Sequence, residues 1–523
     1  DLYVQGHKVK FGSNIIMDRY IKNGTLPDFD IYGGWRKPNE QYSVATNTPT
    51  IEINSGQFNK IIMGNGMGTN AVSNLQNTTS NNIMGSSSAS FGGTVTVDYT
   101  GKMKQEDIGL IAGGNEIGTI YSNAIINIKN GNVGKIIGGN YADSSNRPTS
   151  WAYPLNTFIG TSTINITGGQ IENIIGASYG RNVNGTTIKS DAYYYGTINI
   201  KISGGTINSD IYGAGVGSTT GYNTNSSDAY KSYGANVTTS TNINISGGTI
   251  KGNVYGGGYA YSENLTEAQQ QLDSGALYGN SNVIVNGSPT INGDIYGSGK
   301  GYNYSTVPNN SKMIGNTTVT ISGTPTIGSG KIIYGAGNGL ALSTTAGLTG
   351  NTTINMNATI NKSVYGGGNS ANVIGNTNVN LSASNNLAIH GGGKGTGKVS
   401  LKSSVNINNG TYGTIYGGGQ NNVRETSIIA TGGQASYIYG GGINANSVTT
   451  KSNVNIKGTK IIGMVCGAGG ANSTTTTTNV TLTSSSATIP TVYGGSRVAT
   501  AKATITNVIC SGATITNVYG GTN

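Results

Sequence analysis

Short segments in which apolar and polar residues alternate recur along most of the chain. Residues 241–258, 196–213 and 404–419 are three copies of one unit, whose first half contains Ile/Val-Asn-Ile and whose second half contains Ile/Val-Tyr-Gly. Alternation with a period of two residues indicates a strand with one buried face. We call the first half strand A. The central position of strand A is occupied by Asn127, Asn165, Asn199, Asn244, Asn355, Asn380, Asn406 and Asn455, and by Glu52, Thr96, Ile284, Thr320 and Thr481.

The second half of the unit, strand B, places a tyrosine before a pair of glycines. This position is occupied by Tyr32, Tyr212, Tyr255, Tyr296, Tyr334, Tyr365, Tyr416, Tyr439, Tyr493 and Tyr519, and in degenerate copies by Met63, Ala112, Ile137, Ile175, His390 and Cys466. From Tyr365 onward the copies are 23 to 27 residues apart, which is too short for a helical crossover in every unit. Because strand A resembles the next strand A, a hairpin meander is disfavoured. The pattern predicts an all-β, right-handed parallel β-helix of about fifteen coils.

The glycines and the Tyr column have predicted structural roles. Ser-Gly-Gly after strand A, as at 203–205 and 246–248, and Tyr-Gly-Gly after strand B are both expected to supply positive φ at corners. Outward Asn and Thr side chains are expected to stack from coil to coil. Tyr212 and Tyr255 have the parity of outward positions, so we expect them to face out or cap the corner in a semi-buried stack.

Insertions interrupt the repeat and are expected to lie on one edge of the solenoid. We assign 1–50 to an N-terminal capping region and 51–523 to the β-helix, with the insertions mainly within 138–317. One of them, at 264–272, has the capping residues and apolar spacing of a helix.

The insertions are rich in aromatic residues, which suit a semi-dry binding surface. At least one ring of the consecutive Tyr193, Tyr194 and Tyr195 must face solvent or a partner, because three successive residues cannot all face one core. The same rings could instead fold back onto the β-helix or mediate self-association. The candidate ligand-binding residues are Trp151, Tyr153, Tyr193, Tyr194, Tyr195, Tyr222, Tyr259, Tyr261, Tyr302 and Tyr304.

Composition offers little material for catalysis or cofactor binding. Among 523 residues there are only two His and two Cys, and the net charge of +10 arises from basic residues scattered singly. We therefore expect no metal, no cofactor and no nucleic-acid partner, and the absence of a long apolar run argues against a membrane span. Asp30, Asp210 and Asp294 precede Tyr by two residues and are expected to cap corners rather than to form a catalytic pair.

The His and Cys residues are assigned structural roles. His7 and His390 do not belong to a recognisable triad, and His390 occupies a Tyr-column position. Cys466 and Cys510 lie two coils apart, beyond disulfide reach, so we expect two free and largely buried thiols.

Repeats of the form Ile-Asn-Ile, Gly-Gly-Thr-Ile and Val-Tyr-Gly-Gly-Gly resemble those of secreted bacterial β-helix adhesins. With the Tyr-rich edge and few acidic residues, the chain is similar to the tapirins, cell-surface proteins that adhere to cellulose. The resemblance implies an extracellular, secreted or surface-located adhesin that is not an enzyme and binds an insoluble plant cell-wall polysaccharide such as cellulose. Two alternatives remain open: a β-helix polysaccharide lyase or glycoside hydrolase, and a self-assembling structural rod.

Overall fold

Every regular element in the described part of the chain is a β-strand. The computed structural model describes residues 2–4, 7–12, 29–33, 50–54, 58–64, 94–99, 108–116, 120–121, 123–142, 156–180, 192–218, 237–261, 275–304, 307–309, 312–339, 347–483 and 488–521. The expected helix at 264–272 lies outside these ranges. The chain divides into unit 1, residues 1–280 with 304–312, and unit 2, residues 281–303 with 313–523.

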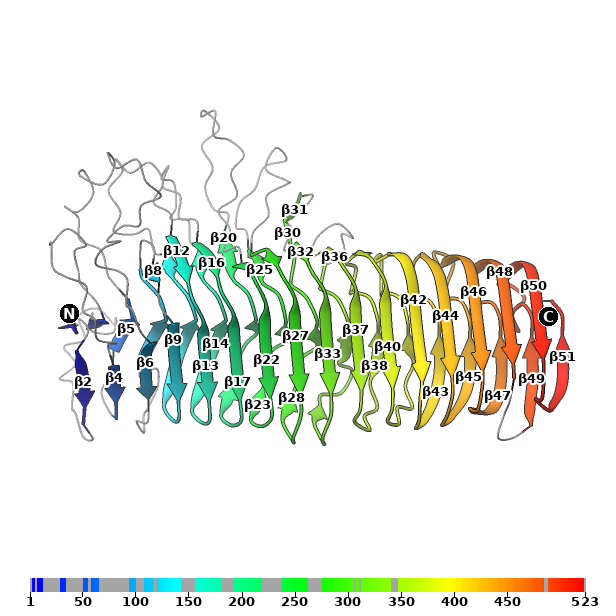
Figure 1. Cartoon of the computed structure of the whole chain (residues 1–523), viewed down its shortest axis with the longest axis horizontal. Helices are drawn as coiled ribbons and strands as arrows, with labels where there is room; N and C mark the ends of the chain where they lie inside the picture. The colour runs from blue at the N-terminus through cyan, green and yellow to red at the C-terminus, as the bar shows by residue number, and fades with distance from the viewer. Residues whose placement is uncertain are drawn as a thin grey trace, which may run out of the picture. The chain divides into compact units, whose positions relative to one another are not determined.

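In unit 1, strand A pairs in parallel with strand A of the next coil, and strand B with strand B (Figure 1). The strand-A sheet contains, in order, β2 (Lys8–Phe11), β4 (Thr50–Ile53), β6 (Thr94–Tyr99), β9 (Asn123–Ile128), β13 (Ser162–Ile166), β17 (Ile198–Ile202) and β22 (Thr241–Ile245). The strand-B sheet contains β1 (Leu2–Tyr3), β3 (Asp30–Tyr32), β5 (Phe58–Ile62), β7 (Ile108–Ala112), β10 (Asn132–Ile137) and β14 (Gln170–Ile175), then the split strands β18 (Thr206–Ile207) with β19 (Ile211–Tyr212) and β23 (Thr249–Ile250) with β24 (Val254–Tyr255).

Two further sets of short parallel strands in unit 1 flank the insertions. One set leads into strand A: β8 (Ile120–Tyr121), β12 (Asn156–Ile159), β16 (Ala192–Tyr195), β21 (Val237–Thr238) and β26 (Leu277–Tyr278). The other set follows strand B as a separate sheet: β11 (Tyr141–Ala142), β15 (Tyr179–Gly180), β20 (Val216–Ser218) and β25 (Tyr259–Tyr261). Within 1–50, the region assigned to a cap, β1, β2 and β3 occupy ordinary strand-A and strand-B positions.

Unit 2 repeats the same parallel arrangement with fewer interruptions. Its strand-A sheet contains β27 (Ser281–Val285), β33 (Thr317–Ile321), β37 (Thr352–Met356), β40 (Thr377–Leu381), β42 (Val399–Ile407), β44 (Val423–Ala430), β46 (Val448–Ile456), β48 (Thr474–Leu482) and β50 (Lys502–Cys510), with β32 (Met313–Ile314), β36 (Leu348–Thr349) and β39 (Val373–Ile374) as lead-in strands. Its strand-B sheet contains β28 (Thr290–Ile291), β29 (Ile295–Tyr296), β34 (Thr326–Ile327), β35 (Ile332–Tyr334), β38 (Ser363–Tyr365), β41 (Ile389–His390), β43 (Thr411–Tyr416), β45 (Gln434–Tyr439), β47 (Lys460–Cys466), β49 (Ile489–Tyr493) and β51 (Ile515–Tyr519). The parallel β-helix expected from the sequence is confirmed.

Each coil encloses an apolar core to which the alternating residues of strand A contribute. Ile243, Ile245, Ile250 and Val254 are almost completely buried, whereas Asn244 between two of them is half-buried, as the alternation predicts. Outward amides bridge successive coils, for example from Asn380 Nδ2 to Asn355 Oδ1 at 2.8 Å. The predicted stacking of outward Asn residues is therefore confirmed.

A second polar interaction crosses the core within several coils. Thr241 Oγ1 donates to the carbonyl oxygen of Gly256 at 2.6 Å, which links strand A to the corner after strand B of the same coil. Thr352 and Thr377 donate in the same way to the carbonyls of Gly366 and Gly391. This bond satisfies a buried hydroxyl and a buried carbonyl together, and so avoids the cost of leaving either unpaired.

The two kinds of glycine corner differ in their physical requirement. After strand A, Gly205 and Gly248 have φ of 79°, as expected. After strand B the positive-φ expectation is wrong, because Gly213 and Gly366 are not among the positive-φ residues. Instead, a Cβ at Gly366 would lie 2.2 Å from the carbonyl oxygen of Gly391 in the next coil. The first glycine after Tyr is therefore needed for close backbone approach.

The Tyr column is more deeply buried than its parity suggests. Tyr212 and Tyr255 stack with their ring centroids 5.3 Å apart, and only 5% and 1% of their surfaces are exposed. The stacked arrangement is confirmed, but the rings are more completely buried than the semi-buried stack that we expected. Rings at equivalent positions cover one another from coil to coil, so the neighbouring coil rather than the parity of the strand sets their burial.

We predict that Ile245→Asp destabilises the fold by several kcal/mol, because it places an unpaired charge in a dry interior. Asn244→Thr should change stability by less than about 0.5 kcal/mol, since Thr stands at the same outward position elsewhere in the repeat. Thermal unfolding followed by circular dichroism provides the comparison. Equal losses for the two variants would contradict the assignment of inward and outward faces.

We also predict that Gly366→Ala lowers the unfolding temperature strongly, because the added Cβ meets a backbone carbonyl that cannot move without separating two coils. The matched control is Gly520→Ala, where a Cβ meets nothing within 4 Å. The control should unfold within a few degrees of the parent protein. A Gly366→Ala protein as stable as the control would show that close approach does not select this glycine.

Candidate functional site

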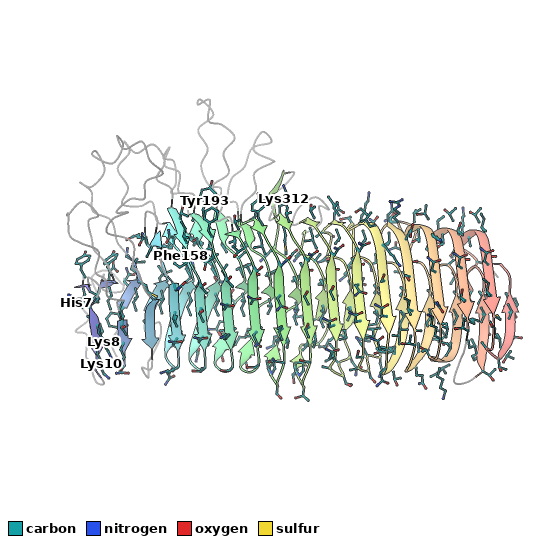
Figure 2. The ribbon with its side chains drawn as sticks, viewed as in Figure 1. His7, Lys8, Lys10, Phe158, Tyr193 and Lys312 are labelled. Carbon is teal, nitrogen blue, oxygen red and sulfur yellow. The ribbon has the colours of Figure 1, made fainter. Side chains whose placement is uncertain are left out.

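The predicted aromatic site residues whose side chains the structure describes differ in exposure. In β16 the three consecutive tyrosines have different environments: Tyr193 is half-buried, Tyr194 is fully buried and Tyr195 is 44% exposed. Figure 2 shows Tyr193 and Phe158 on the lead-in strands at one edge of unit 1. Tyr195 is thus the most exposed of the three rings.

Tyr194 belongs to the interior. Its ring stacks on Phe158 of the neighbouring coil at 4.8 Å, and its hydroxyl donates to the carbonyl oxygens of Gly160 and Thr197, both at 3.2 Å. Burial raises the pKa of the Tyr194 hydroxyl well above its ordinary value. A ligand cannot reach this ring, so Tyr194 has a packing role.

The tyrosines of the sheet formed by β11, β15, β20 and β25 also cover one another. Tyr141 and Tyr179 stack at 5.8 Å, and Lys135 Nζ lies 4.5 Å from the centroid of the Tyr179 ring. Tyr259 stacks at 5.3 Å on Tyr212 of the Tyr column. A sugar that stacks on a ring needs an open face, and these rings have at least one face occupied by the protein. They attach the bases of the insertions to the coils.

The remaining predicted residues belong to the insertions and to the short strands beside them. Trp151, Tyr153 and Tyr222 lie outside the described residues. Tyr261 lies in β25, and Tyr302 and Tyr304 lie in β30 (Tyr302–Tyr304).

An exposed apolar column that the sequence interpretation missed lies on the lead-in strands of unit 2. Ile314 is 40% exposed, Ile374 is 62% exposed, and Thr349 is the register partner of both. Leu401, which is 42% exposed, lies next to this column on the following coil, one position beyond the residue opposite Ile374, and its N–H donates to the carbonyl of Gly375. We call Ile314, Thr349, Ile374 and Leu401 the apolar stripe.

A row of exposed amides runs beside the apolar stripe. Asn316 Oδ1 accepts the backbone N–H of Asn351 at 2.9 Å, and Asn351 Oδ1 accepts that of Asn376 at 2.8 Å. Each amide is therefore held in one orientation by the next coil. The stripe and the amides together form an amphipathic surface over successive coils of unit 2.

A sequence signal for this surface exists. Residues 313–317, 348–352 and 373–377 share the pattern of a buried apolar residue, an outward residue, Gly, Asn and Thr. Residues 277–281, which read Leu-Tyr-Gly-Asn-Ser, follow the same pattern. In unit 1 the outward position of this pattern is taken by Ile159, Tyr195 and Thr238. The outward residue precedes strand A by only a few positions, so it escapes notice when attention is on the insertions.

The carboxylates of Asp210 and Asp294, in the Asp-Ile-Tyr motifs, accept hydrogen bonds from other groups of the protein. Asp210 accepts the Tyr212 hydroxyl at 2.9 Å with one oxygen and the backbone N–H of Asn253 at 2.8 Å with the other. Asp294 similarly accepts the Tyr296 hydroxyl at 3.1 Å and the backbone N–H of Ile332 at 2.9 Å. These contacts fit the expected corner-capping role.

His390 takes part in a continuous ring stack in unit 2. Its imidazole lies 4.3 Å from the ring of Tyr365 and 4.9 Å from that of Tyr416, with nearly parallel planes. Burial disfavours the charged imidazolium and lowers the pKa of His390 to about 3. His7, in contrast, is exposed in unit 1. His390 has the structural position that the Tyr column predicts.

The two cysteines are free, but they differ in burial. Cys466 is buried in the Tyr column, where burial raises the pKa of its thiol to about 12. Cys510 is exposed, so the expectation that it is buried is wrong. Its register partner Leu482 is buried, which shows that the position itself faces inward. Among the described strands β50 has a neighbour on one side only, and this leaves Cys510 uncovered.

Within the described ranges, no three His, Cys, Asp or Glu side chains form a group that could hold a metal ion. The part of the chain that the structure describes contains no helix with the length and apolar character of a membrane span. Comparison of the chain with protein-family models, curated proteins and solved structures found no match.

We predict that His390 makes the fold acid-sensitive. The unfolded chain binds a proton at His390 below about pH 6.5, whereas the folded chain binds it only near pH 3, so this contribution to stability is lost as the pH falls through that window. Between pH 7 and pH 4 the loss should be on the order of 3 kcal/mol. His390→Tyr restores the residue that dominates the column and should flatten the pH dependence of the unfolding temperature.

The control for this prediction is His7→Tyr, which removes the exposed imidazole. Its unfolding temperature should depend on pH as in the parent protein. If His390→Tyr and the parent lose the same stability on acidification, the acid response originates elsewhere.

Proposed function

We propose that the protein is an extracellular, non-catalytic adhesin that binds an extended insoluble polysaccharide, with plant cell-wall cellulose as the first candidate. The observation that carries this proposal is the apolar stripe of unit 2 beside its row of oriented amides. A polysaccharide chain in an extended form presents C–H faces and hydroxyl edges. The apolar stripe can pack against the C–H faces, and the amides can hydrogen-bond to the hydroxyl groups.

The regular spacing of the surface supports an extended rather than a compact ligand. Parallel strands are about 4.8 Å apart, so Ile314, Thr349 and Ile374 lie at that interval on successive coils. A pyranose in an extended β-linked chain occupies a length close to this spacing. Several successive sugars can therefore make the same contact, and weak individual contacts add along the chain.

In unit 1 the exposed ring of Tyr195 supplies an aromatic version of the same contact. The register partners of Tyr195 are Ile159 on one neighbouring coil and Thr238 on the other. Rings present a wide apolar surface at low entropic cost, which favours contact with sugar faces. Because the carboxylates of Asp210 and Asp294 are occupied by corner hydrogen bonds, these residues support binding rather than the hydrolase or lyase alternative.

We predict that replacing Ile314, Ile374 and Leu401 by Ser weakens adsorption to crystalline cellulose. Each side chain is partly exposed and should contribute on the order of 1 kcal/mol on contact, so the triple variant should lose roughly a hundredfold in affinity. Tyr195→Ala should weaken adsorption by a smaller factor. Because the contacts are not ionic, moderate salt should have little effect.

The matched control is Ile462→Ser with Leu387→Ser, since Ile462 and Leu387 are 50% and 47% exposed and lie outside the apolar stripe. This control should adsorb like the parent after circular dichroism confirms that all variants are folded. Undiminished adsorption of the triple variant would exclude the stripe as the binding surface. Release of reducing sugars on the same cellulose samples would instead support an enzyme.

A further inference from the structure

An ionic cluster lies in the strand-B sheet of unit 1, where most positions are apolar. Asp30 of β3 and Lys60 of β5 are direct register partners on neighbouring strands, and Lys60 Nζ lies 3.4 Å from Asp30 Oδ2. Glu116, which follows β7, accepts a hydrogen bond from Lys60 Nζ at 2.8 Å. Asp30 and Glu116 are 8% and 4% exposed, and the Lys60 side chain is 14% exposed. One amine and two carboxyl groups are thus held together nearly out of solvent.

Neighbouring polar groups fix the orientation of both carboxyl groups. Asn59 Nδ2 donates to Asp30 Oδ1 at 2.9 Å. The Tyr32 hydroxyl lies 3.3 Å from Asp30 Oδ2 and 3.3 Å from Glu116 Oε2, between the two acids. Lys60 Nζ also lies over the Tyr32 ring, 5.7 Å from its centroid. The three reacting groups required for amide formation therefore have fixed positions.

The cluster has one negative charge in excess when all three groups are ionised, and a buried site disfavours this excess. Uptake of one proton by a carboxyl group makes it neutral overall. The position of the Tyr32 hydroxyl fits this state, because its single proton can serve one acid while its oxygen accepts the proton of the other. A protonated carboxyl group is the form of an acid that an amine can attack.

The amine needs a nearby base before it can react. Burial lowers the pKa of Lys60, but the adjacent Glu116 carboxylate, with smaller effects of Tyr32 and Asp30, outweighs burial and raises the net pKa above its ordinary value. The ammonium is therefore the resting form. Glu116, at 2.8 Å from Nζ, is positioned to take the proton, and the fixed geometry substitutes for a high concentration of reactants.

We propose that Lys60 and Asp30 form an intramolecular amide cross-link with Glu116 as the proton acceptor. Starting from the ammonium of Lys60, the acid form of Asp30 and the carboxylate of Glu116, a proton moves from Nζ to Glu116. The Nζ lone pair attacks Cγ of Asp30, the N–C bond forms, and the C–O bond to the hydroxyl breaks. The proton on Glu116 assists departure of the hydroxyl, and the second proton lost by Nζ returns to Glu116. The products are an amide, one water and protonated Glu116, without any oxidant or cofactor.

The cross-link joins two neighbouring coils of unit 1 through their side chains. It closes a covalent loop over the segment between β3 and β5, and constraining the unfolded chain in this way stabilises the fold as a disulfide does. The chain contains two cysteines, and both are free in the structure. An amide also resists reduction.

Intact-mass measurement of the denatured full-length protein tests the proposal. The parent protein should be lighter than its sequence requires by one water, and proteolysis should yield a branched peptide that joins the segments around Asp30 and Lys60. Lys60→Arg and Glu116→Gln should have their full sequence masses. Asp30→Asn is the matched control, because attack of the same amine on an amide releases ammonia in place of water.

The outcomes separate clearly. A loss of water in the parent that becomes a loss of ammonia in Asp30→Asn, with the branch at residues 30 and 60, supports the cross-link. A folded parent protein with its full sequence mass overturns the proposal, whatever the variants do. A branch that joins Lys60 to Glu116 overturns the assignment of Asp30 as the acyl partner. A Glu116→Gln protein that still loses water overturns the role of Glu116.

Discussion

The structure depends on the requirement that every coil lie within backbone hydrogen-bonding distance of the next one. At the corner after strand B this distance leaves no room for a side chain: a Cβ at Gly213, Gly366 or Gly417 would come 2.2 to 2.3 Å from a carbonyl oxygen of the neighbouring coil. Glycine must therefore return at the same place in each coil. Once the backbone is in register, equivalent side chains meet at the strand spacing of about 4.8 Å and stack on one another.

Contacts between and across the coils engage many of the polar side chains in the described part of the chain. Thr side chains such as Thr352 bridge the core to a glycine carbonyl, Asn side chains such as Asn380 bind the amide of the previous coil, and Asp210 caps a corner. Groups that are satisfied in this way are poorly suited to move protons or activate a nucleophile. What the coils offer to the outside is a repeated surface, on which a partner of similar periodicity can make many weak contacts.

The sequence was sufficient to predict the strands, their parallel pairing and the inward face of strand A, because these features follow from local alternation and from repetition. It was not sufficient for properties that arise between coils. Tyr255 has outward parity but is buried by the rings of neighbouring coils, and Cys510 has an inward register position but is exposed. Tyr194 looked like a surface residue within a run of three tyrosines, yet Phe158 covers it. Trp151 and other insertion residues lie outside the described part of the chain, so their role as a binding surface stays a prediction.

Departures from the repeat indicate where unique chemistry can arise. Lys60 has Asp30 as its register partner on one side and Leu110 on the other. Residues of opposite charge therefore occupy equivalent positions in two successive coils, where the repeat would place similar residues. The third member of the cluster, Glu116, is 56 residues from Lys60 and 84 from Tyr32 in sequence, and no local pattern could have placed it there. A repeated position can only reproduce the same contact from coil to coil. A site that combines an amine, an acid and a base must therefore lie where the repeat is broken, and the coils on either side supply the rigid frame that holds the three groups together.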